Sequence, residues 1–407
     1  MGDGESVEGD RINAIADSVI HIWYSAFLPA VVLADFQRRV QPLVRDVCSR
    51  IQAKPPGTAL GKTWLFNQIK IRVILSKEQW FLLGDYFGTV KLSCQEARAL
   101  RCAVTLAPER VDFRERWLFK ECTAFTRVAK QKFREDGVLL PFGQSRRDFV
   151  APNPTLFRKL RSWPMDDKTD PLDGWPLWEV HHFPSIAKED CYGKLHAYLI
   201  RRFTMFLLRL RQITTRFEMY CADAADLSTY LDKDQFARIE VANICDSGYL
   251  GIYKTLATLS PLLQSPHSNP FATLLGLFMN AVMEIVYRRD ERDTLPNMDK
   301  LLRLLPAPVD ILKVAQGNSA DTLRIWDART FVLEAEQRFQ EYMNLYRFEE
   351  LSTALHLVLR NENSIVEAWP MRLKLRHGEV GYQEEFDVLL GSNNSGLERH
   401  TEWARTS

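Results

Sequence analysis

The chain has 407 residues, of which 46% are hydrophobic and 26% charged, and its formal net charge at pH 7 is +1. This composition is typical of a folded protein with a large core or two domains, and it excludes an intrinsically disordered chain. The balanced charge excludes a whole-molecule field that would attract nucleic acid or membrane, so such binding needs a local basic surface.

The cysteines and the N-terminus indicate a cellular compartment. Seven cysteines are scattered along the chain, and none forms a Cys-x-x-Cys pair. This predicts a reduced, intracellular protein without structural zinc. The first ten residues are acidic, unlike a signal or transit peptide, and polar residues or proline interrupt the two longest apolar stretches. We therefore expect a cytoplasmic protein that does not span a membrane.

The first third of the chain is predicted to be helical. Residues 1–17 are expected to be a flexible N-terminus and residues 18–135 a helical region. Apolar residues recur with helical period over 11–53, and a Pro-Pro-Gly break follows at 55–57. Helices are expected to continue from residue 60 to the end of this region.

The main α/β domain is predicted over residues 136–390. It opens with a segment, 137–178, so rich in Pro, Gly, Asp and Trp that it cannot be regular structure. Long ordered loops of this kind are usually functional. A helix is expected next, over 192–220.

Residues 236–251 predict a strand, a turn and a helix. A β-branched run containing Ile239, Val241 and Ile244 predicts a buried strand over 236–244; it ends in a polar turn, and a helical pattern starts near Gly251. Ligands of open α/β sheets bind outside the carboxyl ends of the strands, where this turn would lie. The candidate site residues of this segment are Glu240, Asn243, Cys245, Asp246, Ser247 and Tyr249. The alternative is a purely structural turn, with Asp246 as a cap leading the next helix.

Three further elements are predicted towards the C-terminus. Asn269-Pro270 is a good helix start, and the helix that it opens, to about Tyr287, should be buried because it is apolar nearly all round. Residues 372–376 alternate with period two and predict a strand with a basic face. Residues 391–407 are expected to be a polar tail, in which Trp403 alone could dock.

Two charged groups are candidates for chemistry. Asp166, Asp167 and Asp170 place three carboxylates within five residues, which could act as a general base or grip a guanidinium; a solvated acidic loop is the alternative. Arginines recur at intervals of seven on the predicted helix 192–220, where they could follow the phosphates of transfer RNA or form an ordinary basic face. They are Arg202, Arg209 and Arg216.

Common signatures of nucleotide-dependent and hydrolytic enzymes are missing from the sequence. It contains no Walker-type phosphate loop, no Gly-x-Ser-x-Gly elbow, no His-Glu-x-x-His and no Gly-x-Gly-x-x-Gly after a strand. We therefore expect no cofactor and no metal.

The amino-acid sequence of several segments resembles that of a large fungal family, long catalogued as a domain of unknown function and distantly similar to dynein axonemal assembly factors. The resemblance runs from about residue 18 to 403. The segments that carry it include Leu-Pro-Phe-Gly at 140–143, Asp-Pro-Leu-Asp-Gly-Trp at 170–175, residues 238–251, Asn-Pro-Phe-Ala-Thr at 269–273 and Val-Glu-Ala-Trp-Pro-Met-Arg at 366–372.

Within that family, the chain resembles arginine-containing cyclodipeptide synthases, which condense two aminoacyl-tRNAs. The resemblance implies a mainly helical α/β fold with part of a Rossmann or methyltransferase-like sheet, lacking its N-terminal nucleotide-binding half. It implies arginyl-tRNA and a second aminoacyl-tRNA as partners. The family's Asp-Asp-x-x-Glu motif corresponds to residues 166–170, where the last position is Asp170 instead of Glu.

The combined prediction is an enzyme that makes cyclo(Arg-Xaa) for fungal secondary metabolism. Asp166 and Asp167 would act as base or bind guanidinium, Glu240 and Asp246 would line the pocket, and Tyr249 would relay a proton. Cys245 and Ser247 are possible acyl acceptors. The alternatives are a non-enzymatic assembly or scaffold protein and a degenerate methyltransferase-like protein.

Overall fold

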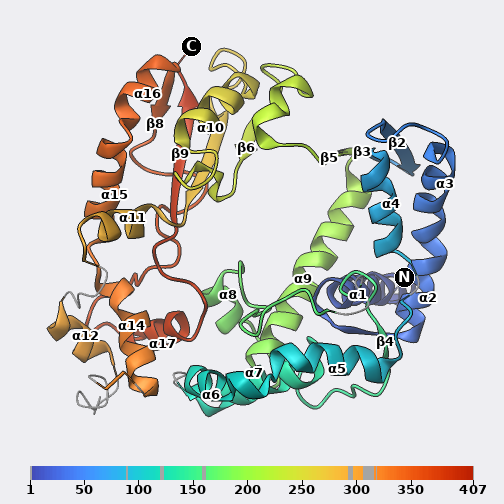
Figure 1. Ribbon diagram of the computed structural model, residues 1–407, viewed down its shortest axis with the longest axis horizontal. Helices are drawn as coiled ribbons and strands as arrows, with labels where there is room; N and C mark the ends of the chain where they lie inside the picture. Colours follow the sequence, from blue (N-terminus) through green and yellow to red (C-terminus); the bar gives the residue numbers. More distant parts are fainter. Residues whose placement is uncertain are drawn as a thin grey trace. The chain divides into compact units, whose positions relative to one another are not determined.

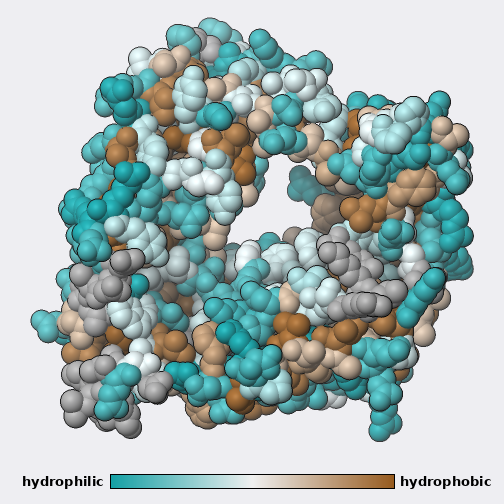
Figure 2. Space-filling view, in the orientation of Figure 1, coloured by the Kyte–Doolittle hydropathy of each residue, from teal (hydrophilic) through white to brown (hydrophobic). Residues whose placement is uncertain are grey.

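The computed structural model describes residues 2–88, 90–119, 123–157, 162–291, 297–305, 316–317 and 319–406 (Figure 1). It is a mixed α/β protein, about 50% helix and 13% strand, with three small sheets. The chain divides into two compact units, residues 1–221 and 222–407. Hydrophilic residues cover most of the face seen in Figure 2, and exposed hydrophobic residues form small patches among them.

The first unit is built mainly from helices. Ser76 and Ser93 each begin a helix with a capping box, in which the serine and the residue three positions later satisfy each other's backbone N–H groups. The longest two helices of the described residues, α1 and α9, pack together through Ile20, Leu195 and Leu199. Because α1 begins at Gly2, the flexible N-terminus predicted for residues 1–17 is wrong: Ile12 and Ala16 recur at helical spacing with Ile20 and are buried. The helices are α1 (Gly2–Tyr24), α2 (Ala30–Arg39), α3 (Gln41–Ile51), α4 (Lys77–Tyr86), α5 (Cys94–Thr105), α6 (Val111–Phe119), α7 (Ala124–Asp136), α8 (Leu177–His181) and α9 (Cys191–Gln212).

Two small sheets complete the first unit. Strands β1 (Phe27–Pro29) and β4 (Phe149–Pro152) pair antiparallel. Strands β2 (Ala59–Phe66) and β3 (Ile69–Ser76) form a hairpin, and β5 (Thr215–Tyr220) adds parallel to β3. Among the described residues of 137–176, regular structure is limited to β4, as the turn-forming residues predict.

The hairpin and β5 correct two helical predictions. Helices were predicted through 60–135, but Ile69, Ile71, Val73 and Leu75 alternate with period two, which is the period of a strand. At the turn, Asn67 adopts the left-handed conformation (φ 53°) that tight hairpins need. The predicted helix 192–220 ends at Gln212, so Arg216 lies on β5 and the three arginines do not share one helix face.

The second unit contains a four-stranded sheet in the order β6-β7-β9-β8 (Figure 1). Strands β6 (Arg238–Glu240) and β7 (Thr273–Phe278) are parallel, while β9 (Arg399–Arg405) runs antiparallel to both β7 and β8 (Leu357–Leu359). The helices are α10 (Ile252–Leu259), α11 (Ala281–Arg288), α12 (Met298–Leu304), α14 (Ala320–Val332), α15 (Ala335–Leu345), α16 (Phe348–Ala354) and α17 (Tyr382–Leu390).

The predicted helix 269–287 is wrong in its first half. Residues 273–278 form β7, and only α11 is helical. A central strand that is covered on both faces is a continuous apolar run, and such a run also fits a buried helix. Asn269 does cap a turn, since its side-chain oxygen accepts from the backbone N–H of Phe271 at 3.0 Å.

The predicted strand 372–376 is also wrong, because side chains satisfy its hydrogen bonds. The Arg372 guanidinium donates to the carbonyls of Phe331 and Leu333, each at 2.9 Å, at the C-terminal end of α14. The backbone N–H groups of Lys374 and Leu375 donate to the Glu385 carboxylate. No neighbouring strand is needed.

The predicted polar tail contains a central strand. β9 lies between β7 and β8, and Trp403 is fully buried in the core of this unit. Beside it the Glu402 side chain is also fully buried, and it accepts hydrogen bonds from the backbone N–H groups of Ser364 (2.9 Å) and Ile365 (2.6 Å).

No helix in the described part of the chain has the length and apolar character required to cross a membrane.

Replacement of Glu402 tests how much this buried carboxylate stabilises the sheet. Burial alone would raise the pKa of Glu402, but the backbone and side-chain donors of residues 364–366 outweigh it and lower the pKa. Because folding lowers this pKa, the ionised carboxylate stabilises the fold at any pH above the pKa in the unfolded chain, about 4.3. This stabilisation is lost as the pH falls through the pKa in the folded protein. Glu402→Gln should reduce the free energy of unfolding at pH 7 by about 1.5–3 kcal/mol, measured by urea unfolding.

The control is Glu362→Gln, at an exposed position nearby. It should leave stability unchanged, and the difference between wild type and Glu402→Gln should shrink below about pH 4. A difference that is constant across pH would contradict this role of the Glu402 charge.

Candidate functional site

The candidate site lies where the parallel strands β6 and β7 end. The predicted order of strand, turn and helix over 236–251 is present, but the strand is shorter than predicted. It spans only Arg238–Glu240 as β6, Asn243–Cys245 form a 3-10 turn that contains Ile244, and α10 begins at Ile252. After β7, Met279 and Asn280 lead directly into α11. Because the two strands are parallel, both loops leave the same edge of the sheet, where ligands of α/β proteins commonly bind.

Asp246 joins these two loops. Its Oδ2 atom accepts hydrogen bonds from the backbone N–H groups of Met279 (3.0 Å) and Asn280 (3.1 Å) and from Nδ2 of Asn280 (3.0 Å). The residue is 1% exposed, and its other oxygen, Oδ1, is buried with no hydrogen-bond partner among the described residues. Asp246 therefore braces the start of α11, not the helix that follows it in sequence.

Burial raises the pKa of Asp246, and the nearby Glu284 charge adds to this effect; the three hydrogen bonds oppose it only in part. A carboxyl that is costly to ionise and already has three donors on one oxygen is suited to holding a loop in place.

The next residue, Ser247, donates its hydroxyl hydrogen bond to Oε2 of Glu284 on α11. The other oxygen of Glu284 accepts from the Tyr346 hydroxyl (2.6 Å) and from Nε of Arg288 (3.1 Å). Burial alone would raise the pKa of Glu284, but these hydrogen bonds together lower it. Glu284 is thus ionised at neutral pH. An ionised carboxylate that accepts a hydrogen bond from a serine hydroxyl activates the serine Oγ as a nucleophile.

A cavity of about 600 Å³ adjoins this pair. Tyr342 lines it and accepts a hydrogen bond from the backbone N–H of Ser247 at 3.2 Å. Burial raises the pKa of Tyr342 far above its ordinary value, so the phenol stays protonated. The polar residues that line the cavity include Ser247, Tyr253, Lys254, Tyr346, Arg347 and Glu350.

Glu284, Tyr342 and Tyr346 were not among the residues predicted from the sequence. A signal existed for Glu284, because it is a charged residue that interrupts an otherwise apolar stretch. For the two tyrosines the signal is weak, because Tyr342 lies on α15 and Tyr346 directly follows it, far along the chain from Ser247, and no local pattern relates them to it.

The remaining predicted residues of this segment lie around the loop. Asn243 is half-buried in the 3-10 turn, and Tyr249 is 62% exposed. Glu240 was expected inside an apolar strand, but β6 is an edge strand, and the Glu240 carboxylate faces solvent and pairs with Arg238 at 2.9 Å. Cys245 is fully buried, and burial raises its pKa to about 12, so it cannot supply a thiolate as acyl acceptor.

In the first unit, the three clustered aspartates have separate partners. Asp166 is exposed and accepts from the backbone N–H of Lys168. Asp167 forms a two-pronged pair with the guanidinium of Arg110, at 3.0 and 3.1 Å. Asp170 is 9% exposed and accepts from the hydroxyl of Tyr192, with a buried lysine, Lys130, 3.4 Å away.

Each aspartate thus has a local structural role. The pairing with guanidinium predicted for this segment occurs, but its partner is an arginine of the same chain. Burial raises the pKa of the Asp167 carboxyl, yet the hydrogen bonds and charge of Arg110 outweigh it and lower the pKa overall.

The three candidate arginines of the first unit are exposed and differ in their partners. Arg202 pairs with Glu179 at 2.6 Å and lies over the ring of Tyr198, 4.9 Å from its centre. Arg216 pairs with Glu218 on the same strand. Nearby carboxylates therefore offset part of the predicted basic stripe.

Comparisons of the chain with protein families, with curated proteins and with solved structures return no match.

Two substitutions of Asp246 separate its role as a brace from its charge. Asp246→Asn keeps an oxygen for the three donors, so the free energy of unfolding should change by less than about 1 kcal/mol. Asp246→Ala leaves buried donors without a partner and should cost about 2–3 kcal/mol, measured by urea unfolding. Equal stability of the two variants would contradict the bracing role.

Proposed function

We propose that this chain synthesises an arginine-containing cyclic dipeptide, cyclo(Arg-Xaa), from arginyl-tRNA and a second aminoacyl-tRNA, as a cytoplasmic enzyme of fungal secondary metabolism. The observation that carries the proposal is the Ser247 hydroxyl on an ionised Glu284 beside a cavity of about 600 Å³. The resemblance of residues 238–251 to the fungal family supports it, since Ser247, Leu250 and Gly251 of this segment line the cavity.

The chemistry of the substrates fits such a site. Aminoacyl esters are already activated, so the reaction needs no ATP. A serine hydroxyl attacks the carbonyl carbon of the first ester, and the ribose hydroxyl leaves with the proton. The α-amine of the second aminoacyl-tRNA then attacks the acyl-serine and releases the serine hydroxyl. The α-amine of the first amino acid finally attacks the second ester, which closes the ring and releases the second ribose hydroxyl. The protein must position both esters, accept a proton and stabilise the oxyanion.

Residues around the cavity would perform these tasks. Ser247 would accept the first acyl group, releasing the ribose hydroxyl, with Glu284 taking the serine proton. Tyr342, kept protonated by its burial, would donate to the oxyanion. Glu350, now paired with Arg347 at 2.9 Å, would exchange that partner for the guanidinium of the substrate.

A relation of the sheet in the second unit to part of a methyltransferase-like sheet belongs to the same proposal. The parallel pair β6 and β7, with α10 in the connection between them, supports a relation to part of a methyltransferase-like sheet. The antiparallel strands β8 and β9 depart from a doubly wound sheet, so the relation concerns this pair alone.

Substitution of the serine and its carboxylate tests the activity. Ser247→Ala and Glu284→Gln should each lower production of Arg-containing cyclic dipeptides at least about 100-fold, because the nucleophile or its proton acceptor is lost. The readout is mass spectrometry of an expression host that makes no such compounds. The control is Ser268→Ala, an exposed serine of the same unit, which should leave production unchanged.

Wild-type production that persists in both variants would move the active site elsewhere. A folded wild-type chain that yields no cyclic dipeptide when supplied with all aminoacyl-tRNAs would favour the alternatives, a scaffold protein or a degenerate methyltransferase-like protein.

Binding of transfer RNA gives a separate test. If Arg202, Arg209 and Arg216 contact phosphates, replacing each by Gln should lower the salt dependence of binding by about one unit of slope per lost contact. Arg209 should contribute most, since Arg202 and Arg216 also form ion pairs with carboxylates. Binding measured over a range of salt concentrations with an unchanged slope would contradict contact by this surface.

A further inference from the structure

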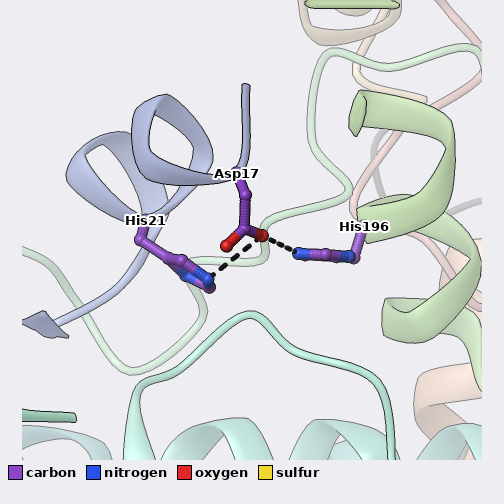
Figure 3. A group of neighbouring side chains, drawn as sticks. All are labelled: Asp17, His21 and His196. Atoms are coloured by element: carbon purple, nitrogen blue, oxygen red, sulfur yellow. Dashed lines mark hydrogen bonds and ion pairs between the residues drawn. The ribbon is translucent and has the colours of Figure 1, made fainter. Parts of the chain in front are cut away.

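The first unit contains a cluster of two histidines and an aspartate that the proposed function does not use. Asp17 and His21 lie one turn apart on α1, and His196 lies on α9, which packs against it (Figure 3). Both Nε2 atoms point to one oxygen of the aspartate, Oδ1, at 2.9 Å from His196 and 3.4 Å from His21.

The ligand atoms are spaced as in a metal site. One from each residue lies within 4.8 Å of the others. In a tetrahedral site with bonds of about 2.0–2.1 Å, neighbouring ligand atoms are roughly 3.3 Å apart, so small side-chain movements would admit an ion. Without an ion, the arrangement requires a proton on each Nε2 to hydrogen-bond the carboxylate.

Neighbouring groups orient the ligands as they do around metals. Nδ1 of His21 lies 3.0 Å from the hydroxyl of Ser25, and a hydrogen bond from Nδ1–H would leave the Nε2 lone pair free for a metal. The ring of Phe149 packs edge-on against His21, with centres 4.7 Å apart. His21 is 1% and His196 8% exposed, so both rings are held in place.

We propose that Asp17, His21 and His196 bind a divalent transition-metal ion of the zinc class. Two imidazoles and one carboxylate are a common ligand set for such ions.

The site keeps room for a further ligand. A cavity of about 630 Å³ is lined by Asp17 and His21, and by Gln144, Arg147 and Asp148 from the turn-rich segment. Three protein ligands and an open side distinguish reactive metal sites from closed structural ones. The ion would therefore be accessible to water or to a small anionic ligand held near Arg147.

Metal titration of the full chain tests the site. After treatment with a chelator, calorimetry with Zn²⁺ should show one ion per chain, and Co²⁺ should give the visible absorption bands of low-coordinate nitrogen and oxygen ligation. His196→Gln and Asp17→Asn should each weaken Zn²⁺ binding at least about 100-fold, since loss of an outer-shell partner alone costs 10–100-fold. The exposed His267→Gln is the matched control and should bind as wild type.

Asp17→Asn keeps the fold testable, because the Asp17 side chain is 42% exposed and Asn preserves its size. Zn²⁺ should raise the melting temperature of wild type and His267→Gln but not of the two ligand variants. Zn²⁺ affinity equal in all four proteins, or a lack of visible Co²⁺ bands, would overturn the proposal and leave a hydrogen-bonded trio that only joins α1 to α9.

Discussion

One oxygen atom of Asp246 determines the geometry at the edge of the sheet in the second unit. Three donors from Met279 and Asn280 converge on it in a place that water does not reach. Since each buried donor without a partner is costly, the β6 loop and the start of α11 are held together. Ser247 follows Asp246 directly and Glu284 lies one turn into α11, so their hydrogen bond depends on this brace.

Local sequence patterns predicted this edge well but the rest of the sheet poorly. The order of strand, turn and helix in 236–251 is confirmed, but the strand is shorter than predicted, because the chain leaves the sheet after Glu240 and Ile244 lies in a 3-10 turn. Strands β7 and β9 were missed for different reasons. A central strand has the same apolar run as a buried helix, and β9 has a polar sequence whose burial depends on partners far along the chain.

The acidic segment shows that the roles of charged residues are hard to predict from the sequence. Three carboxylates within five residues suggested one shared task, yet each faces a different partner, from a backbone turn at Asp166 to a guanidinium at Asp167. Spacing along the chain shows which carboxylates are close in sequence, but the cation that pairs with each one depends on the tertiary fold. In the same way Asp17 and His21 predicted nothing alone, and only the packing of α9 against α1 brings His196 within 2.9 Å of Asp17.

The position of β9 in the sheet has a consequence for synthesis on the ribosome. Strand β7 emerges long before β9, and until β9 arrives one edge of β7 has neither its backbone partners nor the cover of Trp403. A nascent chain with an apolar strand edge exposed for so long can pair with other chains. Chaperones that shield such edges would therefore be expected to raise the yield of folded protein.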